Sequence, residues 1–131
     1  YKQITFLHVY HHIMVFGLMY TYLMFHGPGG HTAVFALYNC FIHTLMYGYY
    51  LLSSSRPELR KSLWWKKYLT VLQIVQFFGI AIHSAWPLFF RPDCKTPKYW
   101  LYTAVVFSTS LNILFVNFYR TAYVKNTIKK K

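Results

Sequence analysis

The chain has 131 residues, of which 56% are hydrophobic and 22% aromatic, while only 12% are charged. Average soluble domains carry about twice that charged share, so the composition is typical of a membrane protein. The 14 Lys and Arg residues stand against two acids and cluster between apolar runs, whereas a nucleic-acid-binding module would interleave them with its fold. We therefore expect a lipid bilayer as partner and no nucleic acid.

Four apolar segments follow one another along the chain, at about residues 5–25, 32–52, 68–90 and 99–123. Each has roughly 20 residues or more, enough to cross a hydrocarbon core of ~30 Å as a helix. The sequence predicts an all-α, polytopic membrane helix bundle, with residues 1–131 forming a single membrane domain. Because it begins at Tyr1 without an initiator Met, we expect it to be part of a longer protein.

The first segment begins with the motif LHVYHH. His8, His11 and His12 stand at i, i+3 and i+4, so on a helix they project within one arc. The glycine- and proline-rich stretch HGPGGH at 26–31 predicts a tight turn, so that the first two segments form a hairpin.

The second and third segments carry polar residues at a similar depth. His43 shares a helix face with Asn39, Tyr47 and Tyr50, and the third segment carries Thr70, Gln73 and Gln76 as a slanted stripe. Polar groups inside a membrane are costly unless they pair or line a cavity, which indicates a functional site. For the stripe alone, simple hydrogen bonding between helices is the stronger reading.

The basic residues predict the orientation in the membrane, because short cytoplasmic loops carry the excess of Lys and Arg. Three lie in the connection between the third and fourth segments, namely Arg91, Lys95 and Lys98, and the other eleven lie on the opposite side. Both chain ends and the middle connection, with Lys66 and Lys67, are therefore predicted to be cytoplasmic. Trp64, Trp65, Trp86 and Trp100 fall at segment ends, as expected of interface anchors.

The residue types in the segments limit the chemistry. The two acids, Glu58 and Asp93, both lie outside the segments, so no carboxylate of this chain serves as an intramembrane base or nucleophile. Imidazole can act as a base near neutral pH and can also be acylated. Cys40, three residues before His43, is a rival nucleophile, although a small buried cysteine is usually inert packing.

Four stretches in chain order resemble signatures of the very-long-chain fatty acid elongase (ELO) family: LHVYHH, NCFIHTLMYGYY, LWWKKYLTVLQIVQF and LFVNFYRTAY. The resemblance implies an acyltransferase, a very-long-chain 3-oxoacyl-CoA synthase of fatty acid biosynthesis. It would condense a long-chain acyl-CoA with malonyl-CoA, releasing carbon dioxide and CoA, without metal or other cofactor. It also implies a multi-pass, seven-helix protein of the endoplasmic reticulum membrane, of which this chain is the last four helices.

The resemblance also assigns roles to residues. His11 matches the histidine that takes the acyl group as an acyl-imidazole, and His43 matches the histidine that shares in the reaction. His8 and His12 would orient the acylated ring, with Asn39 and Tyr47 as hydrogen-bond partners, while Tyr50, Gln73 and Gln76 would line the substrate site. From charge and depth, we expect Lys66, Lys67 and Arg120 to meet the CoA phosphates, unless they only follow the positive-inside rule.

Two other functions stay open from the sequence. A membrane di-iron desaturase or hydroxylase shares the HxxHH pattern but needs about eight histidines in several tight motifs. A transporter or scaffold could use the polar layer to line a path. The resemblance further implies that other elongation enzymes and a second copy of the protein are candidate partners, and that the chain alone lacks an upstream family motif.

Overall fold

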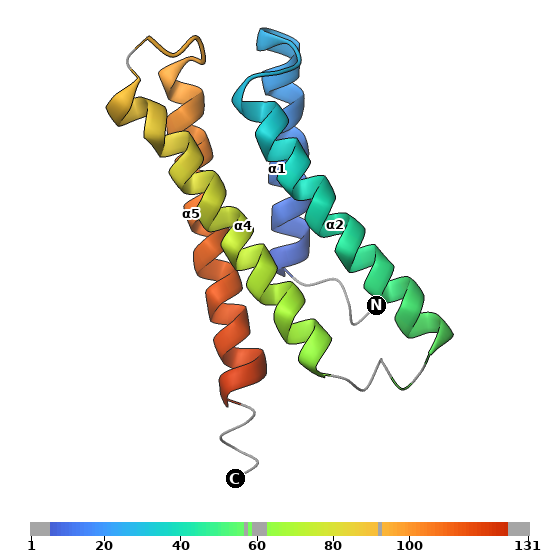
Figure 1. Cartoon of the computed structure of the whole chain (residues 1–131). Coiled ribbons are helices and arrows are strands. Elements are labelled where there is room, and N and C mark those ends of the chain that lie inside the picture. Colours follow the sequence, from blue (N-terminus) through green and yellow to red (C-terminus); the bar gives the residue numbers. More distant parts are fainter. Residues whose placement is uncertain (1–5, 57, 59–62, 92, 126–131) are drawn as a thin grey trace.

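The computed structural model describes residues 6–56, 58, 63–91 and 93–125, and these residues form a bundle of long helices (Figure 1). The helices are α1 (Phe6–His26), α2 (His31–Ser55), α4 (Leu63–Phe90) and α5 (Lys98–Tyr119), and a π-helix, η1 (Arg120–Lys125), continues α5. The prediction of an all-α fold with four long helices is confirmed for this part of the chain.

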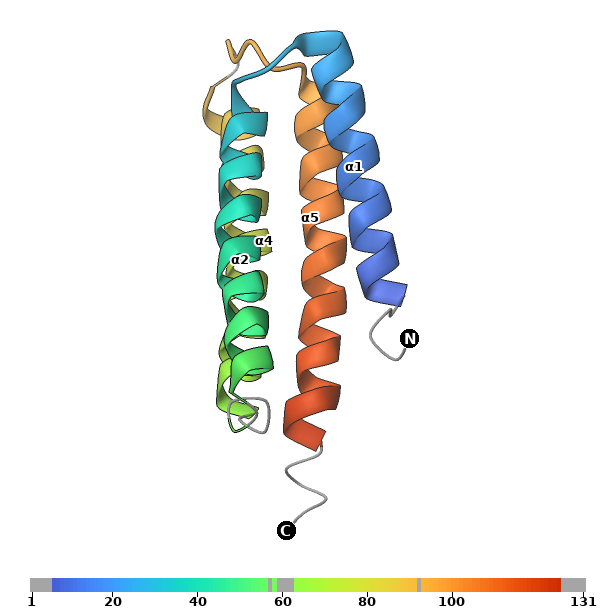
Figure 2. The ribbon, with the colours of Figure 1, turned by 90° about the vertical axis from the view of Figure 1, so that its right-hand side faces the viewer.

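The helices pack as two antiparallel hairpins laid side by side. α4 and α5 make the most extensive contact, α2 packs on α4 and α1 packs on α5. Figure 2 shows α2 with α4 on one side of the bundle and α1 with α5 on the other. Both hairpin turns lie at one end of the bundle, while α2 ends and α4 begins at the other (Figure 1). This alternation is the one that the sequence predicts.

The core lies between α4 and α5. Its buried members are Phe77 and Ile80 on α4 and Phe107, Leu111 and Phe115 on α5, all 9% exposed or less. They recur at spacings of three and four residues, so that each set forms one stripe along its helix. The hairpin of α1 and α2 closes over this stripe through partly buried side chains, namely Leu7, Tyr10, Met14, Val15, Leu18 and Phe35.

The turn between α1 and α2 depends on glycine. Gly27, Gly29 and Gly30 have φ angles of 75°, 115° and 60°, in the left-handed region that side chains with a Cβ rarely adopt. Three such residues within four positions reverse the chain without any loss of helix on either side. The predicted hairpin is confirmed, and the turn fixes where α2 begins.

The helices extend further than the apolar segments at two places. α4 begins at Leu63, so Trp64, Trp65, Lys66 and Lys67, expected in a polar connection, lie on its first turns. α2 continues through Ser55. Charge marks where a membrane interface is expected, but a helix continues past it when no breaker intervenes, since Leu and Lys favour helix. Residues 57 and 59–62 of the predicted connection lie outside the described residues, as do Lys2 and the basic tail at 126–131.

Two stretches of the described residues are long and apolar enough to cross a membrane, Trp64–Phe90 with mean hydropathy 1.4 and Lys98–Val124 with 1.5. α1 and α2 have 21 and 25 residues, a sufficient length, but neither is among the stretches that reach the mean hydropathy of a membrane span over 18 residues. Their histidine, tyrosine and glycine residues lower the hydropathy, and the same histidines are the predicted site.

Candidate active site

His11 is the buried member of the predicted histidine motif, with only 8% of its surface exposed. It lies on the face of α1 that points into the bundle, and its ring makes a T-shaped contact with the ring of Phe77 of α4 at a centroid distance of 5.7 Å. His8 and His12 lie on the more exposed side of the same arc. One imidazole is therefore held inside the bundle, with two others on its outer side.

His43 of α2 completes a cluster of four imidazoles. Its ring is stacked on His11 at 6.1 Å with an interplanar angle of 18°, and it meets His12 at 5.8 Å. On α1, His12 lies 4.5 Å from His8 and 5.0 Å from His11. The prediction that α1 and α2 carry their histidines at one depth is thus matched by direct ring contacts between the two helices.

A partly open cavity of about 210 Å³ adjoins this cluster. Eight of the predicted site residues line it, namely His8, His11, His12, Asn39, His43, Tyr50, Gln73 and Gln76. They come from α1, α2 and α4, and α5 contributes Phe115 and Phe118. None of the described side chains around the cavity is acidic, so it offers imidazole, amide and phenol groups against an apolar wall.

Gln76 is the most buried polar side chain contributed by α4 to this cavity, at 5% exposed. Within the described residues its Nε2 has no hydrogen-bond partner. A buried amide donor without a partner costs about 1–3 kcal/mol, unless a ligand or water accepts its hydrogen bond. Gln73, one turn earlier, donates a long hydrogen bond of 4.0 Å to Met46 Sδ.

Four predicted substrate-binding residues lie outside the cavity wall. Tyr47 is exposed and lies 6.0 Å from His43, ring to ring. Lys66 and Lys67 lie on the first turns of α4. Arg120 lines a different cavity of about 550 Å³, between the outer faces of α4 and α5.

Two further residues that the sequence singled out, Cys40 and Thr70, do not line the histidine cavity. Cys40, the rival nucleophile, is exposed and does not line the histidine cavity. Thr70 is buried, but its hydroxyl donates to the Lys66 carbonyl at 2.9 Å and lies 3.4 Å from the Tyr123 hydroxyl. Its role in the structure is to join α4 to the end of α5.

Sequence reasoning missed the apolar part of the cavity wall. Ile42 of α2, Phe77 of α4, and Phe115 and Phe118 of α5 line it beside the histidines. Each stands three or four residues from a predicted polar member or from another wall residue on its own helix. That spacing is the only signal in the sequence, and it is shared with every other apolar residue of the same faces.

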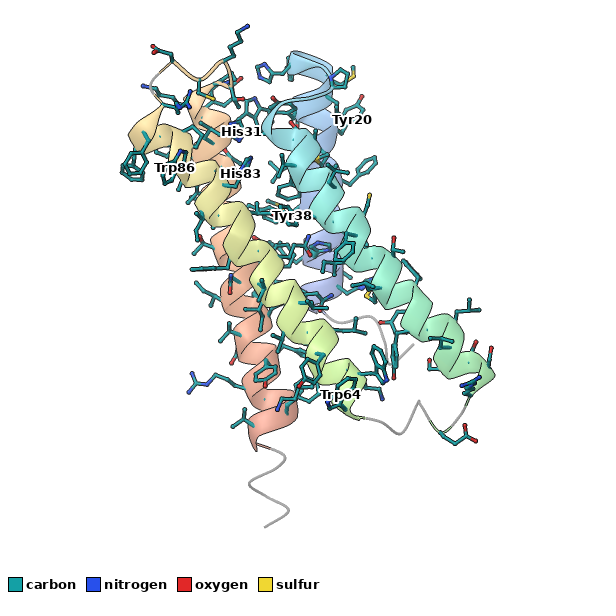
Figure 3. All side chains as sticks on the ribbon, in the orientation of Figure 1. Tyr20, His31, Tyr38, Trp64, His83 and Trp86 are labelled. Atoms are coloured by element: carbon teal, nitrogen blue, oxygen red, sulfur yellow. The ribbon has the colours of Figure 1, made fainter. Side chains whose placement is uncertain are left out.

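A second polar cluster lies at the opposite end of the bundle, near the hairpin turns. His31 Nδ1 and His83 Nε2 are 2.9 Å apart, and Cys94 Sγ lies 3.5 Å from His31 Nε2. Figure 3 shows His31 of α2 and His83 of α4 close to one another. His26 is hydrogen-bonded to the Tyr99 hydroxyl at 2.9 Å. These histidines join the two hairpins and stand apart from the histidine cavity.

Among the residues that the structure describes, no three histidine, cysteine, aspartate or glutamate side chains are grouped so that they could hold a metal ion.

The fold and the cavity define an α-helical bundle with two candidate membrane spans among the described residues and a partly open, histidine-lined site. Comparison with known proteins specifies the class further. The ELO model, described as the GNS1/SUR4 family, matches residues 1–131. The chain therefore belongs to the ELO family.

Curated relatives in animals carry elongase names. The chain is 41% identical over 136 residues to very long chain fatty acid elongase 7 of Drosophila melanogaster, with 100% of this chain and 39% of the relative covered. It is 43% identical over 134 residues to elongase 5 of Tachysurus fulvidraco, covering 98% and 43%. For elongase 4 of Mus musculus the identity is 41% over 122 residues, covering 93% and 38%. The chain spans about two fifths of the length of these relatives.

Proposed function

We propose that the protein containing this chain is a very-long-chain fatty acid elongase. It condenses a long-chain acyl-CoA with malonyl-CoA to give 3-oxoacyl-CoA, carbon dioxide and free CoA. The observation that carries the proposal is the buried His11, stacked on His43 in a cavity of imidazole and amide groups. The elongase names of the relatives support the same reaction.

In the first half of the reaction, a ring nitrogen of His11 attacks the thioester carbonyl of the acyl-CoA. The carbon–sulfur bond breaks, an acyl-imidazole forms, and free CoA leaves as the thiol with the proton that the imidazole gives up. A neighbouring imidazole can carry that proton, and His43 and His12 are the nearest rings. His8 and His12 hold the acylated ring in place.

In the second half, malonyl-CoA loses carbon dioxide, and the electron pair of the broken carbon–carbon bond forms an enolate. The enolate carbon attacks the acyl carbonyl and the bond to His11 breaks. The departing ring nitrogen takes up a proton from water, passed on by a neighbouring imidazole, and this proton returns the His11 imidazole to its starting state. Negative charge develops on the enolate and on the acyl oxygen, so the site needs donors at these positions. The unpaired Nε2 of Gln76 is such a donor, and Asn39 also faces the cavity.

The wider setting is part of the proposal. All four helices would cross the endoplasmic reticulum membrane as the last four of seven, with the C-terminus, Lys66, Lys67 and the start of α1 on the cytoplasmic side. α2 ends and α4 begins at the same end of the bundle, opposite both hairpin turns, and this arrangement supports the proposed orientation (Figure 1). Acyl-CoA and malonyl-CoA, other elongation enzymes and a second copy of the protein are the proposed partners.

The test is intact mass spectrometry of the full-length protein incubated with a long-chain acyl-CoA and no malonyl-CoA, followed by peptide mapping. An acyl adduct on His11 that disappears when malonyl-CoA is added, with formation of 3-oxoacyl-CoA, is the expected result. An adduct on Cys40 would overturn the role of His11 and keep the condensation. Protein that binds acyl-CoA but forms no 3-oxoacyl-CoA would overturn the function.

A further inference from the structure

A continuous series of aromatic rings leads from the histidine cavity to the end of the bundle where α4 begins. Tyr47 lies 6.0 Å from His43 and 6.1 Å from Tyr50, and Tyr50 lies 5.8 Å from Tyr49. Tyr49 then contacts Trp65 of α4, with nearly parallel rings 6.5 Å apart and an angle of 26°. The series therefore starts inside the site on α2 and crosses to α4.

The series ends in an aromatic platform, which we define as Trp64, Trp65 and Tyr68 of α4. Trp64 lies 5.2 Å from Trp65 and 4.6 Å from Tyr68, ring to ring. Trp64 is 57% exposed, Trp65 43% and Tyr68 50%, so each ring has a contacting side and an open side. Below Trp65, Tyr49 is buried at 7% exposed and supports the platform from α2.

Positive charge is built into the same two turns. Lys66 and Lys67 stand between Trp65 and Tyr68 in sequence, and Lys67 is exposed. Trp64 is perpendicular to Trp65, at 88°, and tilted by 55° from Tyr68, so a ligand can stack on the open face of one ring at a time. An exposed aromatic face beside ammonium groups suits a ligand with an aromatic base and phosphates. If these residues only anchored the protein in the membrane, the platform would not need to contact the site, and the lysines would not need a particular position.

The placement also fits the size of the substrate. From His43 to Tyr50 is seven residues of α2, about 10 Å by helical rise, and Tyr49 and Trp65 continue from there. In CoA a flexible pantetheine arm separates the thioester from the adenine nucleotide. With the thioester at His11, the arm runs outward past Tyr50, and the nucleotide reaches the end of the bundle.

We propose that the platform binds the adenine base of CoA by stacking, while Lys66 and Lys67 face its phosphates. This inference rests on the proposed function and adds the nucleotide-binding residues to it. The platform determines specificity for CoA, the carrier of the acyl group, whereas the histidine cavity acts on the reacting carbon atoms. The residues that the inference adds are Tyr49, Trp64, Trp65 and Tyr68.

The experiment compares two malonyl thioesters as substrates for the full-length protein in bilayer nanodiscs. Malonyl-CoA carries the nucleotide, and malonyl-pantetheine lacks it. In Trp64→Leu, and in the double variant with Tyr68→Leu, the KM for malonyl-CoA should rise on the order of tenfold, with kcat little changed. The KM for malonyl-pantetheine should stay the same. Trp64→Phe, which keeps a ring, should restore most of the binding.

Trp86 supplies a matched control on the same helix. It is 55% exposed and stacked on Phe90 at 4.3 Å, and Figure 3 shows it at the opposite end of α4 from Trp64. Trp86→Leu removes the same ring from the other interface, so it should leave both KM values unchanged. An equal effect of Trp86→Leu, or an equal effect of Trp64→Leu on both thioesters, would overturn the proposal in favour of membrane anchoring.

A binding measurement separates this inference from the proposed reaction. Adenosine 3′,5′-bisphosphate, the nucleotide end of CoA, should quench tryptophan fluorescence of the wild-type protein and much less that of Trp64→Leu. If the protein lacks condensing activity but shows this difference, the elongase proposal fails and the nucleotide site stands. Condensing activity with no nucleotide-dependent difference in either assay would retain the reaction and overturn the platform.

Discussion

His11 and His43 lie with their rings stacked at 6.1 Å, although one belongs to α1 and the other to α2, across the hairpin turn. α1 and α2 each pack mainly on a different helix, α5 and α4 respectively. The two imidazoles are therefore held in contact by the turn between α1 and α2 and by the α4–α5 pair, on which both helices pack.

Replacing His11 should abolish condensation. His11→Ala removes the proposed nucleophile, so the rate should fall by at least about 100-fold, and the acyl adduct should be lost. The measurement is 3-oxoacyl-CoA formation by the full-length protein, with circular dichroism to check the fold. His26→Gln, a histidine hydrogen-bonded to Tyr99 at the far end, is the control and should keep its activity. Retained turnover in His11→Ala would contradict the assignment.

Gln76 should separate stability from activity. Gln76→Leu removes a buried donor that has no partner among the described residues, so the protein should be equally stable or more stable, by up to about 1 kcal/mol. The condensation rate should nevertheless fall at least about tenfold, since a donor for developing negative charge is lost. Thermal unfolding and turnover are measured on the same sample.

Asn112→Leu is the contrasting variant. In the wild-type protein the Asn112 Nδ2 donates a hydrogen bond to the Ile74 carbonyl at 3.2 Å, and this bond joins α5 to α4 away from the histidine cavity. This variant should lower the unfolding temperature and keep the rate. If both variants changed stability and activity in the same direction, the role proposed for Gln76 would not hold.

The pair of His31 and His83 should behave as one structural unit. His83→Leu leaves His31 Nδ1 without its partner at 2.9 Å, and His31→Leu does the same to His83. Each should destabilise the protein by about 1 kcal/mol, and the double variant by less than the sum of the two. A double-mutant cycle on unfolding in detergent measures this coupling, and a coupling of zero would mean that the hydrogen bond contributes nothing.

Phe77 should contribute to both the core and the site. It is 2% exposed and contacts Phe115 at 5.3 Å as well as His11. Phe77→Ala should cost about 3 kcal/mol through the space it leaves, and should lower the rate because His11 loses the aromatic ring that packs against it. Phe78→Ala, at a neighbouring residue that is 61% exposed, should have little effect on either.

Much of the fold could be predicted from the sequence because its signals are local. Apolar length predicted the four helices within a few residues, and HGPGGH predicted the turn, since glycine adopts the φ angles found there far more readily than other residues. α4 begins at Leu63, five residues before the apolar segment expected at about 68–90. Composition marks where polar residues begin, whereas a helix continues until its backbone hydrogen bonds can no longer form.

The candidate site was predictable where helical spacing determines direction. His8, His11, His12 and His43 meet because i, i+3 and i+4 positions share a face, and depth brought the two helices into register. Arg120 shows the limit. Charge and depth selected it, but it stands four residues after Val116 and seven after Ile113, and all three line the cavity between the outer faces of α4 and α5. Which face of α5 turns inward depends on packing, which charge alone does not predict.

The absence of acids from the described wall of the histidine cavity has a consequence for binding. An enzyme that relies on an imidazole usually gives it a carboxylate as partner, and here the described residues supply none. The malonyl group brings a carboxylate of its own. Before decarboxylation it can accept hydrogen bonds from the imidazoles and amides, and when it leaves as carbon dioxide its negative charge passes to the enolate. The substrate would then act as the missing counter-ion, and the same donors would meet its charge before and after decarboxylation.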